Sequence, residues 1–524
     1  MLQLVLTTAI HCALALPQDT LPQDTPPPTP PEGPPPFMSR FEWDPEIERG
    51  LQLRTEAATP GLTFIQPLNG TESYLIDLDG EIVHRWSFDC SPGAWAYLLD
   101  DGNLLRAGRE DEEPAFKGGG IGGRIQLVAP DSEVVWNYDL ASNDLCQHHD
   151  LEPLPNGNLL VIAWERHPEE EAIAHGRDPE WVGEAGLWLD TVIELRPILP
   201  DGAEVVWQWR AWDHVIQDYD PRMERFGDVA GESGRIDINA DVRAKPPLTA
   251  QERERLATLM QRLEALGYTG GVTSNSITVE ADSEEALEER RAKLARSGDM
   301  MHTNGIDYLA EHDLIVLSSP ELNEVFVIDH STTTEEAAGN SGGRFGRGGE
   351  LLWRWGNPKN YGAGEDDDQR LRYQHAPEWI VTDSGDLHLL VFNNGGGRGE
   401  DGEGWSSVEE LALPFDPERG FVREASAAFG PSEPVWIHED RERFFSAFIS
   451  GATRLSSGNT LVCSGAGGRV FEVDPDGRTV WDYRNGLGGD VMPPDHAGKA
   501  PPLALFRAAR YSESHPGIRA VLGD

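Results

Sequence analysis

Three histidines occupy matching places in a repeated sequence pattern, each just before a segment that is typical of a β-hairpin. They occur in the segments Gln147-His148-His149-Asp150, Met301-His302-Thr303-Asn304 and Tyr373-Gln374-His375-Ala376. A neutral imidazole can bind zinc, copper or iron, and it can also act as a nucleophile beside a bound oxyanion. One histidine at a strand start is usually structural. Three at the same register predict a shared site, with the metal and nucleophile alternatives both open.

The elements that must position these histidines are a short strand ending in tryptophan and a tight hairpin. Asp101-Gly102, Asn156-Gly157 and Ser457-Gly458 are turn pairs that tolerate the positive φ of two-residue hairpins. The alternation predicts an all-β fold, a six-bladed β-propeller over residues 37–524, with a β-sandwich as the alternative. Innermost strands of a propeller line its axis, so His149, His302 and His375 should converge there. The six Trp-strands end at Trp86, Trp136, Trp207, Trp353, Trp436 and Trp481.

One segment interrupts the repeat. Residues 213–298 form a gap much longer than those between the other units, and Thr249-x-x-Glu252 within it is a capping box. Leu256, Leu259, Met260, Leu263 and Leu266 then follow the helical period, and Gly267 ends it. A second amphipathic helix is predicted from Ser283 to Arg296. We therefore expect a mainly helical insertion on one face of the propeller.

The N-terminal segment has the composition of an exported protein. Residues 1–16 are apolar and end in Ala13-Leu14-Ala15, an A-x-A pattern that makes them a candidate signal peptide. Residues 17–36 are rich in proline, which predicts a stiff linker. We expect a periplasmic or secreted protein. Cys90, Cys146 and Cys463 form no CxxC motif, so the sequence supports no zinc site but leaves one disulfide open.

Composition excludes several classes of partner. The 524 residues carry a net charge of −47, which argues against binding to nucleic acid or anionic lipid. No stretch is apolar for the roughly 18 residues that a membrane span needs. Only five residues are lysine, so any anion site must be built from arginine, histidine or backbone amides. The Gly-rich segment 117–123 lacks the spacing and terminal lysine of a nucleotide phosphate loop, and we expect a flexible loop there.

At these motifs the chain resembles the bacterial PAPS-independent arylsulfotransferases, from about Gly61 to Tyr483 without the insertion. The matching motifs are His148-His149-Asp150 with Leu154-Pro-Asn-Gly-Asn158, His302-x-Asn304 with Ser318-Ser319, and Gln374-His375 with Phe392-Asn-Asn-Gly395 and Arg398. The resemblance implies a six-bladed propeller in which His375 is transiently sulfated. It also implies that His149 and His302 are catalytic and that Asn304 belongs to the same site. Thr303, between His302 and Asn304, is a further candidate substrate-binding residue.

The chain departs from that family at Pro320, where an arginine usually follows the paired serines. Arg398 and Arg469, both in Gly-rich loops, are the candidates to replace its charge. The resemblance implies sulfuryl transfer from an aryl sulfate to a phenolic acceptor through a sulfohistidine, with no nucleotide and no cofactor. The alternatives are a His-ligated metalloenzyme and a non-catalytic, quinoprotein-like binding propeller. The sequence does not predict the oligomeric state.

Overall fold

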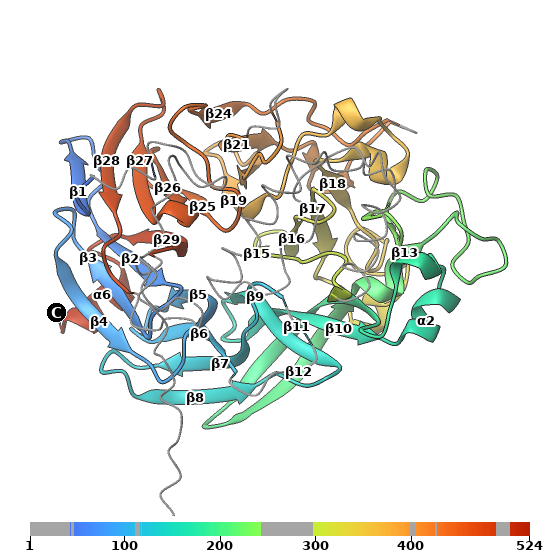
Figure 1. The fold of residues 1–524 in the computed structure, drawn as a ribbon, viewed down its shortest axis with the longest axis horizontal. Coiled ribbons are helices and arrows are strands. Elements are labelled where there is room, and N and C mark those ends of the chain that lie inside the picture. Colours follow the sequence, from blue (N-terminus) through green and yellow to red (C-terminus); the bar gives the residue numbers. More distant parts are fainter. Residues whose placement is uncertain are drawn as a thin grey trace, which may run out of the picture. The chain divides into compact units, whose positions relative to one another are not determined.

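The molecule is built from antiparallel sheets that succeed one another along the chain (Figure 1). A computed structural model describes residues 42, 47–110, 116, 118–242, 297–398, 404–424, 427–488 and 503–523, all within one compact unit, residues 33–524. Strands dominate and the helices are short, which confirms the all-β prediction. The sheets have a propeller-like arrangement.

Two four-stranded meanders form an eight-stranded sheet, with the order β12-β11-β10-β9-β5-β6-β7-β8. The two halves meet through one parallel contact, between Ala94 of β5 and His149 of β9. The strands are β5 (Pro92–Leu98), β6 (Leu104–Arg109), β7 (Gly123–Val128), β8 (Val134–Asp139), β9 (Leu145–Pro153), β10 (Leu159–His167), β11 (Leu187–Ile198) and β12 (Gly202–Arg210).

Two further four-stranded sheets follow, in the orders β15-β16-β17-β18 and β19-β20-β21-β24. The strands are β15 (Gly305–Leu309), β16 (Leu314–Ser319), β17 (Glu324–Asp329), β18 (Trp353–Trp355), β19 (His375–Val381), β20 (Leu387–Asn393), β21 (Ser407–Ala412) and β24 (Trp436–Glu439).

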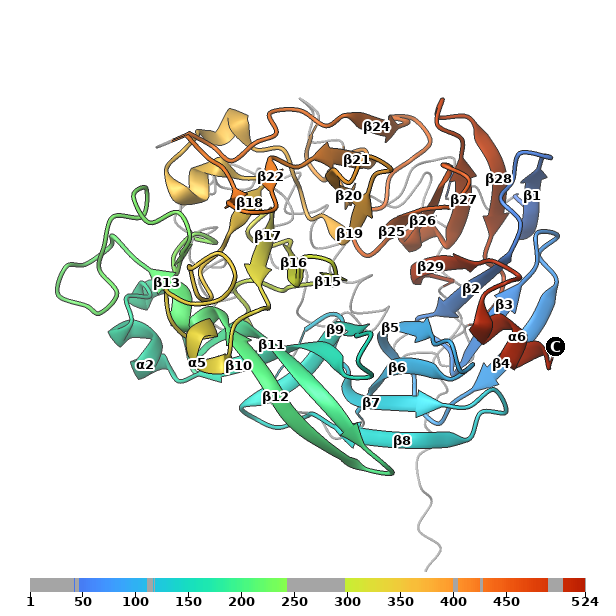
Figure 2. The same ribbon diagram turned by 180° about the vertical axis from the view of Figure 1, so that it is seen from behind.

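The two ends of the chain are interlocked in the remaining large sheets. The N-terminal strand β1 (Gly50–Arg54) adds to the edge of β28 (Thr479–Arg484), β27 (Arg469–Val473), β26 (Thr460–Ser464) and β25 (Gly451–Arg454). The C-terminal strand β29 (Leu505–Tyr511) lies at the edge of β2 (Leu62–Pro67), β3 (Glu72–Ile76) and β4 (Ile82–Ser87). The strands β29, β5, β9, β15, β19 and β25 contact one another in this order, and β25 contacts β29. Figure 2 shows the same sheets from behind.

The sequence signals for strands and turns correspond to these elements. The turn glycines Gly102, Gly157 and Gly458 have φ values of 88°, 85° and 89°, which explains why glycine occupies these hairpin positions. The indole N–H groups of Trp136 and Trp481, both fully buried, donate to the carbonyls of Gly202 and Leu78 in other strand-turn units. The tryptophans therefore fasten neighbouring units together.

The predicted insertion, residues 213–298, is described only over residues 213–242 and 297–298. This part contains turns and a short parallel pair, β13 (Val215–Ile216) with β14 (Ile236–Asp237). The two predicted helices lie outside the described residues, as do the candidate signal peptide (1–16) and the proline-rich linker (17–36). The remaining elements are α2 (Glu169–Ala174), η1 (Pro179–Trp181), η2 (Ala211–His214), α5 (Thr334–Ala337), η4 (Pro358–Tyr361), η5 (Asp366–Asp368), β22 (Phe415–Asp416), β23 (Gly420–Phe421), η6 (Gly465–Gly467) and α6 (Pro516–Leu522).

None of the helices in the described ranges is long and apolar enough to cross a membrane. Cys90, Cys146 and Cys463 are buried free thiols, so the disulfide that the sequence left open is not formed among them.

Candidate active site

The structure brings the three predicted histidines together. The rings of His149 and His302 are in edge-to-face contact with centroids 4.5 Å apart. The ring of Phe506, from β29, lies 6.1 Å from that of His149 and 6.3 Å from that of His375. All three histidines are buried. We call His149, His302 and His375 the histidine cluster.

Two of these histidines have a strained backbone. His149 has a φ of 51° and His302 a φ of 53°, in the left-handed region that residues other than glycine rarely adopt. Each such residue costs on the order of 1 kcal/mol or more and is retained where the surroundings enforce it. Such strain is concentrated at functional sites in known proteins, and here it occurs at two members of one cluster.

The hydrogen bonds of His375 fix the position of its proton. Its Nδ1 lies 2.9 Å from the carbonyl oxygen of Tyr373 and 2.8 Å from Oδ1 of Asn394. The amide nitrogen of Asn394 donates to the carbonyls of Ser446 and Ile449, so the oxygen must face His375. Since both partners are acceptors, Nδ1 carries the proton and Nε2 has a free lone pair. Burial lowers the pKa of His375 to about 3, which keeps the ring neutral.

His302 has the opposite electrostatic environment. Its Nδ1 lies 2.6 Å from Oδ2 of Asp299, and its backbone N–H donates to Oδ1 of the same carboxylate. Burial disfavours the charged ring, but Asp299, together with Glu321 and Asp190, raises the pKa of His302 above its ordinary value. Within one cluster, the pKa of His302 is therefore raised while those of His149 and His375 are lowered.

His149 is linked to a second carboxylate through its neighbour. Its Nδ1 lies 2.8 Å from Nδ1 of His148, and Nε2 of His148 lies 3.2 Å from Oδ1 of Asp190. Burial first, and then the proximity of His302, His148, His375 and Arg507, holds the pKa of His149 well below its usual value.

The other predicted substrate-binding residues lie beside His302 and carry unused polar atoms. The backbone N–H of Thr303 donates to Asp190, and the amide nitrogen of Asn304 donates to the carbonyl of Gln374. Within the described ranges, Oγ1 of Thr303 and Oδ1 of Asn304 are buried without a hydrogen-bond partner. Leaving a buried polar atom unpaired costs about 1–3 kcal/mol, so both atoms are suited to bind a ligand.

The paired serines next to Pro320 hold the histidine-bearing segments. The Ser318 hydroxyl donates to the carbonyl of Gln374, and the Ser319 hydroxyl donates to that of Met301. These bonds join the residues before His375 and His302 to strand β16. The serines therefore position the cluster through its backbone.

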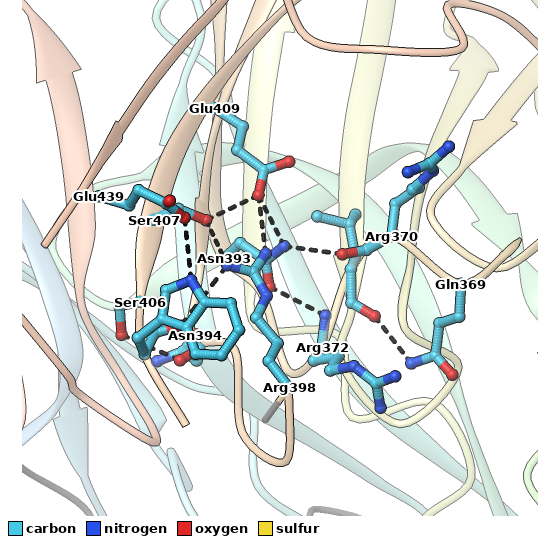
Figure 3. A network of polar contacts seen from close by, with 12 residues as sticks. Gln369, Arg370, Arg372, Asn393, Asn394, Arg398, Ser406, Ser407, Glu409 and Glu439 are labelled. Atoms are coloured by element: carbon cyan, nitrogen blue, oxygen red, sulfur yellow. Dashed lines mark hydrogen bonds and ion pairs between the residues drawn. The ribbon is translucent and has the colours of Figure 1, made fainter. Parts of the chain in front are cut away.

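Arg398 belongs to a polar network next to Asn394 (Figure 3). Its guanidinium donates to the hydroxyl of Ser407 at 2.7 Å and to the carboxylate of Glu409 at 2.8 Å. The side chain of Asn393 donates to the same carboxylate. Arg398 thus supports the turn that carries Asn394, and its predicted contact with substrate stays a prediction.

Arg469 is also engaged with a carboxylate. Its guanidinium lies 2.9 Å from Oδ2 of Asp482, on the adjacent strand β28. Its predicted contact with substrate likewise stays a prediction. The arginine whose charge lowers the pKa of both His149 and His375 is Arg507, of β29.

Sequence reasoning missed several residues of the site. Asp299 and Asp190 lacked any motif that separates them from the chain's many other acids. Arg507 lies beyond the last recognisable Trp-strand. The Gly-rich segment was interpreted as a flexible loop, but a side chain on Gly120 would meet the ring of His149 at 2.3 Å. The absence of a side chain there was the available signal, because only glycine can pack so closely.

The arrangement supplies a neutral ring with a free lone pair on Nε2 of His375, a histidine with a raised pKa at His302, and polar atoms of Thr303 and Asn304 that lack a partner among the described residues. Among the described residues, no three or more His, Cys, Asp or Glu side chains are grouped so that they could hold a metal ion.

The fold and the site define a propeller-like β protein with a buried histidine cluster. The family described as Arylsulfotransferase (ASST) matches residues 55–480. The chain belongs to this arylsulfotransferase family, which indicates a sulfotransferase-type enzyme acting on small molecules. No curated protein matches the chain.

Several solved structures are similar in outline. A protein of unknown function from Bacteroides caccae is 11% identical, with a TM-score of 0.39, over 86% of this chain and 99% of that one. The periplasmic gluconolactonase of Pseudomonas aeruginosa is 12% identical, with a TM-score of 0.33, over 82% of this chain and 97% of that one.

Proposed function

We propose that this protein transfers a sulfuryl group from an aryl sulfate to a phenolic acceptor in two steps, through a sulfohistidine at His375. The observation that carries the proposal is the fixed proton on Nδ1 of His375, which leaves Nε2 as a nucleophile at neutral pH. His302, in the same cluster and with its pKa raised by Asp299, supplies the matching acid when it is protonated. Family membership supports the same reaction class.

In the first step, the lone pair of Nε2 on His375 forms a bond to sulfur, and the bond from sulfur to the aryl oxygen breaks. The electron pair goes to the aryl oxygen, which takes a proton from Nε2 of His302 and leaves as a phenol. His302 is then neutral. Because sulfuryl transfer develops charge on the leaving oxygen, an acid at this position lowers the barrier for poor leaving groups.

In the second step, the acceptor phenol gives its proton to His302 and its oxygen attacks the sulfur. The nitrogen–sulfur bond breaks, and its electron pair returns to Nε2 of His375. His302 is again an imidazolium, so the cycle closes without a nucleotide. Asp299 supports both states through the bond to Nδ1, which directs the exchangeable proton to Nε2.

We also infer that the scaffold has six blades. The eight-stranded sheet consists of two four-stranded meanders, β5–β8 and β9–β12, whose strands are joined by a single pairing, the parallel one between Ala94 and His149. Counted with the other four large sheets, these units give the six blades expected from the six Trp-strands. This scaffold supports a site formed where its innermost strands meet.

Intact-protein mass spectrometry after incubation with 4-nitrophenyl sulfate tests the function. We expect the wild-type protein to gain one sulfuryl group and His375→Ala to gain none. With phenyl sulfate as the donor, whose leaving group needs a proton, His149→Ala and His302→Ala should transfer about 10²–10⁴-fold more slowly, the usual range for acid–base groups. His330→Gln is the matched control, because His330 is bound to Asp313 and Glu194 and has no place in the proposed chemistry. Equal labelling of the wild-type and His375→Ala proteins would refute the proposal.

A further inference from the structure

A bound sulfuryl group requires the histidine-bearing segments to keep one geometry while the group is transferred between substrate and His375. The segments come from different strands, β9 and β19, and from the residues that precede β15. Misplacement of a reacting group by about 1 Å can cost about 10²-fold in rate. A side chain that connects these segments is therefore a candidate for a role in the reaction, and Arg507 has this position.

Arg507 lies on β29, yet its guanidinium contacts the segment that carries His149 and the segment that carries His302. Its Nη2 is 2.6 Å from Oδ2 of Asp150, the residue after His149. The same nitrogen donates to the carbonyl of Asn304, two residues after His302, at 3.3 Å. Asp150 in turn accepts the backbone N–H of Ile306 at 3.2 Å. One guanidinium thus contacts both the strand that carries His149 and the segment before β15 that carries His302.

The inner strands leave room for this side chain through two glycines. A Cβ on Gly305 would lie 3.0 Å from Nη2 of Arg507, and a Cβ on Gly451 would lie 3.1 Å from its Cγ. The same Cβ on Gly451 would lie 3.0 Å from Cβ of Ala376, the neighbour of His375. The stem of Arg507 therefore passes directly beside the third histidine-bearing strand.

The environment of Arg507 makes it costly to lose. Asp150 is fully buried, and removing its partner would leave an uncompensated charge. Only 11% of the Arg507 side chain is exposed, and in the described structure its Nε has no hydrogen-bond partner. The charge of Arg507 also acts on His149 and His375, and it disfavours protonation of both rings.

We propose that Arg507 is a positioning residue of the histidine cluster: through Asp150 and Asn304 it sets the spacing of His149 and His302 opposite His375. The inference rests on the proposed sulfuryl transfer. It extends the site to strand β29, which lies outside the residues that match the family. Arg507 contacts no reacting atom in this account and acts through its two partners.

A cavity next to Arg507 allows a specific test by chemical rescue. The cavity has a volume of about 240 Å³ and is lined by Arg507, Tyr97, Glu152, Glu378 and Tyr511, among others. In Arg507→Ala this cavity would extend to Asp150, and added guanidinium ion could restore the missing contact. We expect the rate of His375 sulfation to fall by about 10²-fold in Arg507→Ala, with a large part recovered by guanidinium chloride but not by methylammonium chloride. Arg507→Lys should remain impaired, because an ammonium cannot reproduce the planar contact.

Arg510→Ala provides the matched control. Arg510 lies on the same strand and donates to Thr63 and Glu472, away from the histidine cluster. The Arg510→Ala protein should be less stable than wild type, but His375 should be sulfated at the wild-type rate. Added guanidinium should not change that rate. An unchanged rate in Arg507→Ala, or a reduced rate that guanidinium does not improve, would overturn the inference.

A crystal structure of Arg507→Ala separates this inference from the proposed function. We expect the 4.5 Å contact between the rings of His149 and His302 to be lost. A variant structure that keeps this contact would overturn the positioning role, whatever the activity. Absence of labelling in the wild-type protein would instead refute sulfuryl transfer, while loss of the ring contact would still support the positioning role.

Discussion

Replacement of Asp299 by asparagine should remove the acid function of His302 and leave the shape of the site intact. Asparagine has nearly the same size as aspartate, and its amide oxygen can still accept one hydrogen bond. The substitution removes the negative charge of the carboxylate. In the wild-type protein, Oδ2 of this carboxylate lies 2.6 Å from Nδ1 of His302. Burial then dominates, and the pKa of His302 should fall below its ordinary value.

The size of the effect follows from the charge pair. Two unit charges about 4 Å apart interact by about 4 kcal/mol at an effective dielectric constant of about 20. Since about 1.4 kcal/mol corresponds to a factor of ten, the imidazolium of His302 loses about three orders of magnitude of preference over the neutral ring. Acid-assisted departure of the phenol at pH 7 should therefore slow by about 10²–10³-fold.

The choice of donor reveals the acid role. 4-Nitrophenolate leaves readily without a proton, whereas phenolate from phenyl sulfate needs one. The rate of His375 sulfation in Asp299→Asn should therefore fall strongly with phenyl sulfate and only slightly with 4-nitrophenyl sulfate. Rates are measured in single turnovers by rapid quench and mass spectrometry, so that the second step does not interfere.

Asp313→Asn is the matched control. Oδ1 of Asp313 lies 2.6 Å from Nδ1 of His330, the same contact between the same groups outside the cluster. This variant should lose stability and keep the wild-type ratio of the two donor rates. An equal loss with both donors in Asp299→Asn would refute the reasoning, because it would indicate a distorted site instead of a missing acid.

Three further outcomes are expected. Asn394→Ala removes the acceptor that fixes the proton of His375 and should slow labelling by about 10²-fold, by analogy with tautomer-fixing carboxylates; an unchanged labelling rate would contradict this role. Burial raises the pKa of Glu378 from 4.5 to about 8, so ionisation destabilises the folded state above pH 4.5, and Glu378→Gln should unfold at a higher temperature than wild type at pH 8.5 but not at pH 4.5. Burial lowers the pKa of His330, but Asp313 and Glu194 outweigh it and raise the pKa from 6.5 to about 9. Protonated His330 therefore contributes about 3 kcal/mol to the stability of the folded state below pH 6.5, and this contribution is lost as the pH rises through 9. His330→Gln should thus unfold earlier than wild type at pH 6 and equally at pH 10, and a constant difference in unfolding temperature would contradict the assignment.

Much of the fold could be predicted because its signals are local. Gly102 and Trp136 mark a turn and a strand through their own conformational and packing preferences. Strand β29 gave no such signal. It contains neither tryptophan nor a tight turn, and its partner strand lies far away, as in the bond from Arg510 to Thr63 across 447 positions. A pairing over that distance cannot be inferred from local sequence.

The candidate site divides in the same way. His149, His302 and His375 could be found from their repeat register, because the repeat itself positions them. The roles of Asp299 and Asn394 depend on which atom faces which ring, and the sequence does not encode that in any local pattern. Arg398 and Arg469 were selected for their Gly-rich surroundings. Because the chain is so acidic, each of these arginines has a carboxylate beside it: Glu409 lies near Arg398, and Asp482 lies near Arg469.

The interlocked ends have a consequence for the order in which the molecule assembles during synthesis. Strands β2–β4 leave the ribosome long before β29, the strand that completes their sheet. The histidines can therefore be present in a nascent chain that still lacks Arg507 and Phe506. Joining segments this distant is slow, because the entropy of a large loop must be lost before the contacts form. Catalytic competence should thus appear as a late event, after most of the sheets have formed.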